Sequence, residues 1–262
     1  MIRKKLSSIL TNNNFTGKVL IALTVFVFVA GLVVYLPTTS MVSNTVGDRE
    51  LPIYCVDTDE KKVALSFDAA WGNEDTTQIL DTLAKYDVCV TFFMTGEWVE
   101  KYPEDVKNIS AAGHDLANHS ENHLEMSKLS VSEIKDELMC VHDKVKELTG
   151  VEMTLFRPPY GDYDNELVTT ANECNYYTIQ WSVDSLDWKD YGTESIIDTV
   201  VNHKNLDNGA IILMHNGATY TAEALPKVIE GLQEKGYEIV PISELIIKDN
   251  YHLDNTGKQF AD

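Results

Sequence analysis

The sequence predicts an α/β fold, a (β/α) barrel of about seven strands preceded by an N-terminal transmembrane helix. Three observations support this prediction. The hydrophobic period switches repeatedly between the value of a strand and that of a helix, as expected when helices cover a parallel sheet. The chain has 262 residues, 44% of them hydrophobic, which is enough for the core of one large domain. An uncharged apolar run of membrane-spanning length stands near the N-terminus.

The N-terminal segment is basic and then apolar. Residues 1–18 contain four basic side chains and no acidic one, and residues 19–36 contain no charge. A spanning helix needs roughly 17–25 apolar residues. Because basic flanks stay on the cytoplasmic side, we expect residues 1–18 in the cytoplasm and residues 19–36 as a single-pass anchor in the cell membrane. A signal peptide is the alternative, and residues 36–40 make a poor cleavage site.

The rest of the chain is expected as a linker over residues 37–60 and one extracytoplasmic domain over residues 61–262. The start of the linker is rich in Thr, Ser, Asn and Gly and lacks periodicity. Residues 41–262 hold 17 Lys and Arg, which is the total of 21 less the four near the N-terminus, against 41 Asp and Glu, a formal charge of −24. Such a domain repels a phosphate backbone. We therefore expect a monomer that does not bind nucleic acid.

Strand and helix patterns alternate through the domain. The best-marked helix is expected at 130–150, because Ser130 and Glu133 have capping-box spacing and Gly150 ends the apolar run. Strands are expected at 62–67, 88–94, 114–118, 154–157, 177–183, 210–214 and 237–240. The other helices are expected at 74–86, 103–112, 166–173, 194–204 and 222–235, with a short terminal helix from Ser243.

Polar residues follow several of these strands. In barrels of parallel strands, reactive groups lie at the carboxyl ends of the strands, so residues there are candidates for a site. The candidates are Asp68, His119, Arg157, Asp187 and His215.

Two histidines stand four positions apart, at His119 and His123. On a helical turn such residues share a face, with Cβ atoms about 5–6 Å apart, and both imidazoles can bind one cation. An isolated pair of this kind is more often solvated than bound to a metal. The motifs that precede and follow the pair in this chain make a metal site the better interpretation.

Five short motifs follow one another along the chain. They are Ser66-Phe67-Asp68, His119-Ser120-x-x-His123, Arg157-Pro158-Pro159-Tyr160-Gly161, Asp187-Trp188 and Leu213-Met214-His215. In this order they resemble the motifs of the polysaccharide deacetylases of the NodB-homology family, carbohydrate esterase family 4, and the resemblance extends from Val63 to the C-terminus. The resemblance implies a distorted (β/α) barrel that binds Zn²⁺ or a similar ion and removes N- or O-acetyl groups from glycans.

The first motif departs from the family pattern. Family members normally read Thr-Phe-Asp-Asp-Gly there, and the second Asp is the third metal ligand, whereas Ala69 follows Asp68 in this chain. This form resembles a branch from spore-forming bacteria that includes the muramic acid deacetylases of the spore cortex, and other members of that branch also lack the second carboxylate. Glu74 or Asp75 could replace the ligand, but acidic residues there more often interact with a helix dipole.

The resemblance implies a role for each catalytic candidate. Asp68 is the general base, and Arg157 holds its carboxylate ionised and correctly aimed. The backbone N–H of Tyr160 completes an oxyanion hole. His215 is the general acid, and Asp187 raises its pKa.

The resemblance also implies a metal site and an acetyl pocket. His119 and His123 would hold one divalent metal ion, Zn²⁺ or Co²⁺. Trp188 and Leu213 would line the pocket, with Trp181 as a further candidate.

We therefore predict a metal-dependent hydrolase that removes N-acetyl groups from N-acetylglucosamine or N-acetylmuramic acid in cell-wall peptidoglycan. A zincin protease is disfavoured because Ser120 follows the first histidine, where Glu is required. Two alternatives stay open. One is a membrane-tethered glycan-binding protein with impaired catalysis, and the other is a deacetylase of chitin-like or O-acetylated polysaccharide.

Overall fold

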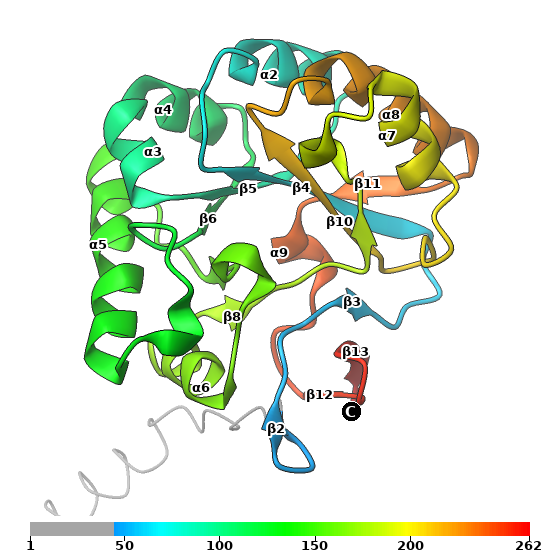
Figure 1. Ribbon diagram of the computed structural model, residues 1–262. Coiled ribbons are helices and arrows are strands. Elements are labelled where there is room, and N and C mark those ends of the chain that lie inside the picture. The colour runs from blue at the N-terminus through cyan, green and yellow to red at the C-terminus, as the bar shows by residue number, and fades with distance from the viewer. Residues whose placement is uncertain (1–44) are drawn as a thin grey trace, which may run out of the picture. The chain divides into compact units, whose positions relative to one another are not determined.

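The computed structural model describes residues 45–262, in which one curled parallel sheet carries helices around its outer face (Figure 1). This confirms the predicted α/β class. The predicted cytoplasmic segment and the anchor at 19–36 lie outside the described residues. Among residues 45–262, no helix combines the length and apolar character needed to cross a membrane.

The main sheet has eight strands, and all pair in parallel. The predicted strand at 177–183 is divided, because the chain pairs with one edge of the sheet at its start and with the other edge at its end. This segment therefore links the two edges of the curled sheet. In spatial order the strands are β8 (Tyr177–Thr178), β7 (Leu155–Phe156), β6 (Asp115–Asn118), β5 (Thr91–Met94), β4 (Lys62–Ala69), β10 (Ile211–Asn216) and β9 (Val183–Asp184), with β11 (Glu238–Val240) beside the first half of β4.

Helices connect successive strands, as predicted. One helix was not anticipated: α3, where Oγ1 of Thr95 caps the start by accepting a hydrogen bond from the Trp98 N–H at 3.2 Å. The helices are α2 (Thr76–Lys85), α3 (Gly96–Lys101), α4 (Pro103–Ala111), α5 (Val131–Thr149), α6 (Asn165–Glu173), α7 (Thr193–Val201), α8 (Thr221–Glu234) and the short α9 (Ile242–Leu245).

Alternation along the strands separates two apolar layers. On β4, Val63, Leu65 and Phe67 belong to the cluster under the surrounding helices, while Ala64 belongs to a second cluster that fills the inside of the curl. Since side chains alternate along a strand, Ser66 and Asp68 share the inner face with Ala64. Polar residues thus stand on the inner face, above an apolar floor, at the carboxyl end of the sheet.

Residues 45–60 differ from the linker that the sequence predicts. They include a β1–β2 hairpin (Thr45–Val46 and Arg49–Glu50) and β3 (Cys55–Val56). Ile53 is fully buried, and its N–H donates to the Thr178 carbonyl at 2.8 Å. A second small sheet, also unpredicted, joins β3 to β13 (Lys258–Ala261) and β12 (Tyr251–Leu253). The folded domain therefore begins before residue 61.

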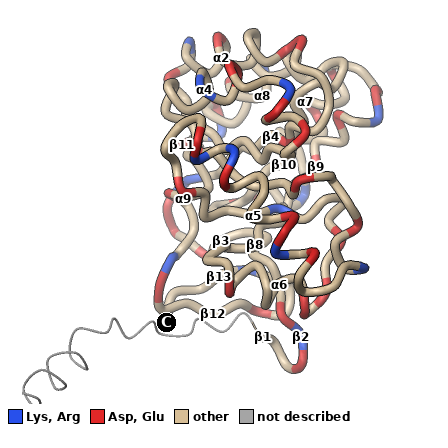
Figure 2. The backbone as a smooth tube through the Cα atoms, turned by 90° about the vertical axis from the view of Figure 1, so that its left-hand side faces the viewer, with Lys and Arg blue, Asp and Glu red and all other residues tan. Residues whose placement is uncertain are grey.

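Acidic residues are spread along the helices and loops of the domain, and basic residues are interspersed among them (Figure 2). Several exposed pairs join them, such as Lys107 with Glu104 at 2.7 Å and Lys135 with Glu173 at 3.0 Å. Exposed pairs of this kind contribute about 0–1 kcal/mol each. They neutralise charge locally, but the excess of acidic residues keeps the domain strongly anionic.

Asn118 connects the end of β6 to the layer behind it. Its fully buried amide donates to the Leu138 carbonyl at 2.8 Å and to the Tyr176 hydroxyl at 3.0 Å, and its oxygen accepts from the Ser120 N–H at 2.9 Å. We expect Asn118→Ala to lower the free energy of unfolding by about 2–4 kcal/mol, because buried partners lose their hydrogen bonds. Urea unfolding measures this.

Asn205→Ala is the matched control. Asn205 is exposed, and its side chain donates one hydrogen bond, to the Ser182 carbonyl at 3.1 Å. Its loss should change the free energy of unfolding by less than about 0.5 kcal/mol. Equal losses in the two variants would show that Asn118 has no special part in joining β6 to α5.

Candidate active site

The two predicted metal-binding histidines lie in an irregular turn after β6, not on the helical turn that their spacing predicted. Ser120 and His123 have φ angles of 65° and 53°, in the left-handed region. The turn holds this shape because the Asn118 side chain accepts the Ser120 N–H, and Oγ of Ser120 accepts the His123 N–H at 3.0 Å. The His119 and His123 rings still come together, with centroids 4.9 Å apart.

His119 is buried and presents one nitrogen to Asp68. Its Nδ1 lies 2.7 Å from the Arg157 carbonyl oxygen, which can only accept, so Nδ1 carries the proton. Burial lowers the pKa of His119 to about 4, although the Asp68 carboxylate acts to raise it, so the ring is neutral at neutral pH. Its Nε2 lone pair then faces Oδ2 of Asp68 at 3.5 Å. Two acceptors face one another there, an arrangement that a cation or a water molecule between them would relieve.

Asp68 and Arg157 form a buried ion pair at the end of β4. Nη1 of Arg157 donates to Oδ1 of Asp68 at 2.6 Å, and Nη2 donates to Oγ of Ser66 at 2.9 Å. The fully buried guanidinium also lies 4.0 Å from the centre of the Phe93 ring. Burial acts to raise the pKa of Asp68, but the charge and hydrogen bond of Arg157, together with the neighbouring His119 and His215, hold that pKa below the ordinary value. Asp68 is thus ionised at neutral pH.

His215 and Asp187 form a second pair, one strand away. Oδ1 of the fully buried Asp187 accepts from Nδ1 of His215 at 2.7 Å, and its Oδ2 accepts from the His215 N–H and from Oγ1 of Thr221, each at 2.7 Å. Burial acts to lower the pKa of His215, but the hydrogen bond and charge of Asp187 raise it above the ordinary value. His215 therefore retains a proton to higher pH than an ordinary histidine, with Nε2 as its remaining donor.

Tyr160 stands beside the histidines in a strained conformation. Its φ and ψ of 61° and 3° are left-handed, which costs a residue with a side chain about 1–2 kcal/mol. Its ring centroid lies 4.6 Å from that of His123, and 68% of the residue is exposed. Such strain is common where backbone groups are aimed at a ligand. The oxyanion role of its N–H stays a prediction.

The three predicted pocket residues lie at different depths. Leu213 is buried two positions before His215, on the same face of β10. Trp181 lies with its ring centre 5.6 Å from the Arg157 guanidinium. Trp188 is 48% exposed, with Nζ of Lys189 4.8 Å from its ring centre. Leu213 is thus deep, Trp181 is half-buried, and Trp188 is at the surface.

Several residues that the sequence did not single out hold the predicted ones in place. The alternation of side chains along β4 could have indicated Ser66 as a neighbour of the site, because Ser66 shares a face of the strand with Asp68. Nothing local marked Thr221, or Glu137, whose carboxylate accepts two hydrogen bonds from Asn122 in the histidine turn. Nor did the sequence indicate that Trp71 stacks on His215, with centroids 5.0 Å apart.

The donors for a metal ion are two neutral imidazoles. Ala69 is fully buried, and among residues 45–262 no group of three His, Cys, Asp or Glu side chains is arranged to hold a metal ion. Asp75 does not replace the missing ligand, because its carboxylate accepts the Gly217 N–H at 2.9 and 3.0 Å. The facing lone pairs of His119 and Asp68 fit a cation, but with fewer protein ligands than the usual three of catalytic zinc sites.

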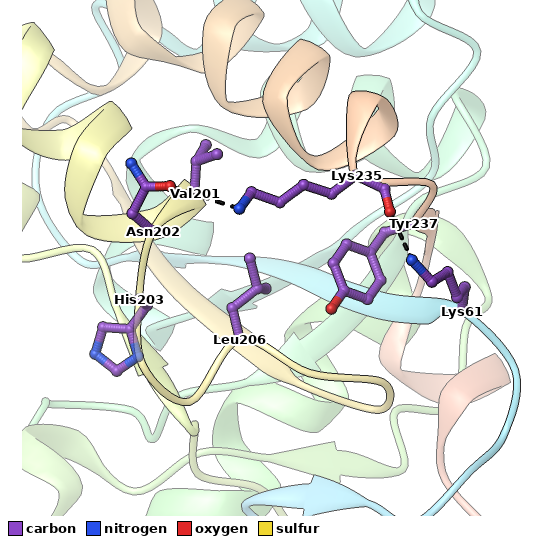
Figure 3. A pocket seen from close by; sticks show the side chains of 7 residues that line it. All are labelled: Lys61, Val201, Asn202, His203, Leu206, Lys235 and Tyr237. Atoms are coloured by element: carbon purple, nitrogen blue, oxygen red, sulfur yellow. Dashed lines mark hydrogen bonds between the residues drawn. The ribbon is translucent and has the colours of Figure 1, made fainter.

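A surface pocket of about 400 Å³ lies away from these residues, at the amino end of β4 (Figure 3). It contains none of the predicted site residues. Its two lysines bind neighbouring groups: Nζ of Lys61 donates to the Lys235 carbonyl at 2.7 Å, and Nζ of Lys235 to Asn202 at 3.5 Å. The lining is Lys61, Val201, Asn202, His203, Leu206, Lys235 and Tyr237.

Comparison with known proteins places this geometry in a family. A family model described as polysaccharide deacetylase matches residues 56–179. The peptidoglycan-N-acetylmuramic acid deacetylase PdaA of Bacillus subtilis is 33% identical over 80% of this chain and 81% of its own length. A peptidoglycan-N-acetylglucosamine deacetylase of Bacillus cereus is 37% identical over 73% of this chain and 91% of its own. A crystal structure of a carbohydrate esterase family 4 pseudoenzyme from Bacillus anthracis aligns with a TM-score of 0.72 and 34% identity, covering 81% of this chain and 73% of that one.

The pKa values of His119 and His215, which their surroundings shift in opposite directions, can be measured in the metal-free protein. We expect an NMR titration of the imidazole signals to give a pKa near 4 for His119 and above 6.5 for His215. Because the folded-state pKa of His119 is depressed, its contribution to stability is present above pH 6.5 and is lost as the pH falls towards 4. Asp187→Asn should bring the pKa of His215 below 6.5, since burial then dominates. An unchanged pKa of His215 in that variant would contradict the assigned cause.

Proposed function

Because the chain belongs to the polysaccharide deacetylase family, we propose that it hydrolyses N-acetyl groups on the amino sugars of cell-wall peptidoglycan. One observation carries the proposal. Asp68 and His215 are register partners on adjacent strands, and their surroundings shift their pKa values in opposite directions. A base held ionised beside an acid held protonated is what amide hydrolysis at neutral pH requires.

The mechanism assigns one proton to each member of this pair. Asp68 accepts a proton from the water that adds to the acetyl carbon. Arg157, its buried partner, holds the carboxylate in place throughout. The backbone N–H of Tyr160 donates to the oxyanion, and such a donor contributes about 10²–10³ in rate. His215 then protonates the sugar nitrogen as the C–N bond breaks, and acetate and a free amine result.

His119 and His123 would hold a divalent ion, Zn²⁺ or Co²⁺, which would polarise the acetyl carbonyl. Their low pKa values support this role, because a neutral imidazole needs no deprotonation before it binds a metal. The hydrogen bond from Nδ1 of His119 to the Arg157 carbonyl also orients the ring, as is usual for metal-binding histidines.

The cellular setting that we propose follows from the N-terminal sequence. The basic segment and the apolar run at 19–36 favour an anchor in the cell membrane with the domain outside, where peptidoglycan is accessible. Both N-acetylglucosamine and N-acetylmuramic acid are candidate sugars, since relatives of similar identity are named for each. Chitin-like oligomers and O-acetylated polysaccharides are further candidate substrates for the same chemistry. Sporulation is a further candidate for the process in which it acts.

One observation favours a second function, a glycan-binding protein without catalysis. Ala69 stands where the family's third metal ligand is expected, and a similar solved structure is named a pseudoenzyme. Against this stands the full set of Asp68, Arg157, Asp187 and His215, which a binding module does not need. Activity measurements distinguish the two functions.

We expect Asp68→Asn to lower the rate of acetate release from purified peptidoglycan by about 10²–10⁴, because the general base is lost. The variant should also lose about 3 kcal/mol of stability, since Arg157 keeps a buried charge without a countercharge. Rates are therefore compared at a temperature at which circular dichroism shows both proteins folded.

Asp81→Asn makes the same chemical change on the exposed face of α2 and should leave the rate within about twofold. An unchanged rate in folded Asp68→Asn would refute the assignment of the base. No acetate release by the wild type with any metal ion, together with binding to the glycan, would establish the second function.

Removal of metal should also stop catalysis. We expect a chelator to abolish acetate release and Zn²⁺ or Co²⁺ to restore it. His123→Ala should raise the dissociation constant for Zn²⁺, measured by calorimetry, by about 100-fold, since one of two imidazoles is lost. His203→Ala, at the distant pocket, should leave it unchanged. Full activity after exhaustive chelation would contradict the metal role.

A further inference from the structure

The loop after β4 carries Trp71 in a fixed position at the edge of the site. Its neighbour Gly72 is tied down at the carbonyl, which accepts from Nε1 of Trp98 and from Nδ2 of Asn216, each at 3.1 Å. Gly217 packs against the base of the side chain, where an added Cβ would come within 3.3 Å of the Trp71 Cβ. The backbone around Trp71 and the base of its side chain are thus held in place, although 47% of the residue is exposed.

The indole covers one face of the His215 imidazole. The two rings are inclined by 18°, with centroids 5.0 Å apart, so they are nearly parallel. His215 has Nδ1 engaged with Asp187, and its donor to a leaving group is Nε2, at the edge of the ring. The face of the imidazole is therefore closed by Trp71, while its edge stays available.

Exposed aromatic side chains gather at this end of the sheet. Large apolar residues that are exposed among residues 45–262 include four aromatic ones, all in loops that follow β4, β7 and β9. They are Trp71, Tyr160, Trp188 and Tyr191. Exposed apolar groups that cluster around a site are more often binding surfaces than isolated ones are.

We propose that the outer face of Trp71 binds a second sugar of the glycan, next to the sugar that reacts. The reacting sugar must present its nitrogen to Nε2 at the imidazole edge. A sugar stacked on the indole lies over the ring face instead, so it is a different unit of the same chain. The C–H groups of a pyranose ring are a suitable partner for the electron-rich face of an indole. This inference deepens the proposed function and rests on it for the placement of the reacting sugar.

A ligand of at least two sugars should therefore bind more tightly than a free amino sugar. Nε1 of Trp71 supports this, because it has no hydrogen-bond partner within the described part of the chain and is available to a sugar hydroxyl. The polar edge and apolar face of an indole suit the mixed surface of a glycan.

The test measures binding by calorimetry, with the full-length chain and two ladders of ligands. One is β-1,4-linked N-acetylglucosamine of one, two and four units, and the other is the matching fragments of peptidoglycan glycan. We expect Trp71→Ala to weaken binding of the tetramer of at least one ladder by about tenfold and binding of the monomer by less than about twofold. Trp71→Phe, which keeps a smaller ring, should lie between. Met139→Ala, an exposed apolar residue of α5, is the control and should bind as the wild type does.

Three results would overturn the inference. The first is a wild type that does not bind either tetramer. The second is equal tetramer affinity in the wild type and in folded Trp71→Ala, and the third is an equal loss of affinity for monomer and tetramer, which would mean that Trp71 acts only through His215. Near-ultraviolet circular dichroism confirms that each variant is folded. If the wild type releases no acetate but Trp71→Ala still loses tetramer binding selectively, the proposed catalysis fails while the sugar subsite stands.

Discussion

The buried pair of Asp68 and Arg157 is the interaction on which the site depends. A fully buried guanidinium is tolerable only with a countercharge and with partners for its N–H groups. Asp68 supplies the countercharge and accepts from Nη1, and Ser66 and the Gln180 carbonyl accept from Nη2, whereas Nε has no partner among the described residues. These partners come from β4 and from the segment that links the two edges of the sheet. The carbonyl of Arg157 then fixes the orientation of His119. One ion pair thus keeps Asp68 charged, joins β4 to the segment that links the two edges of the sheet and orients the neighbouring imidazole.

Strand alternation explains why these groups meet. Ala64, Ala117, Leu155 and Ile211 fill the inside of the curl, and the polar residues follow at even spacings on the same strands. Because the strands are parallel, their carboxyl ends lie at one edge. The apolar floor below removes water from one side of the site, so burial affects every titratable group there. Specific partners then decide the direction of each pKa shift, which explains why His119 and His215 differ.

The ion pairs of the site are complete, but its metal ligands are not. Asp68 and His215 each keep the charged partner that shifts their pKa, while among residues 45–262 no group of three His, Cys, Asp or Glu side chains could hold a metal ion. Trp71 stands two residues after Ala69, in the loop that follows β4. An exposed aromatic ring therefore lies close in sequence to the buried alanine at which a third metal ligand is missing.

The sequence by itself determined the α/β class, the order of most strands and helices, and the candidates Asp68, His119, Arg157, Asp187 and His215, because hydrophobic periods and ordered motifs are local signals. Only the tertiary structure decided that 177–184 bridges two edges of the sheet, that residues 45–60 are folded, and that the histidine turn is not helical. It also revealed the parts played by Ser66, Thr221 and Trp71. These depend on contacts between residues far apart in the chain, and hydrogen bonds and stacking across such distances leave no periodic trace in a sequence.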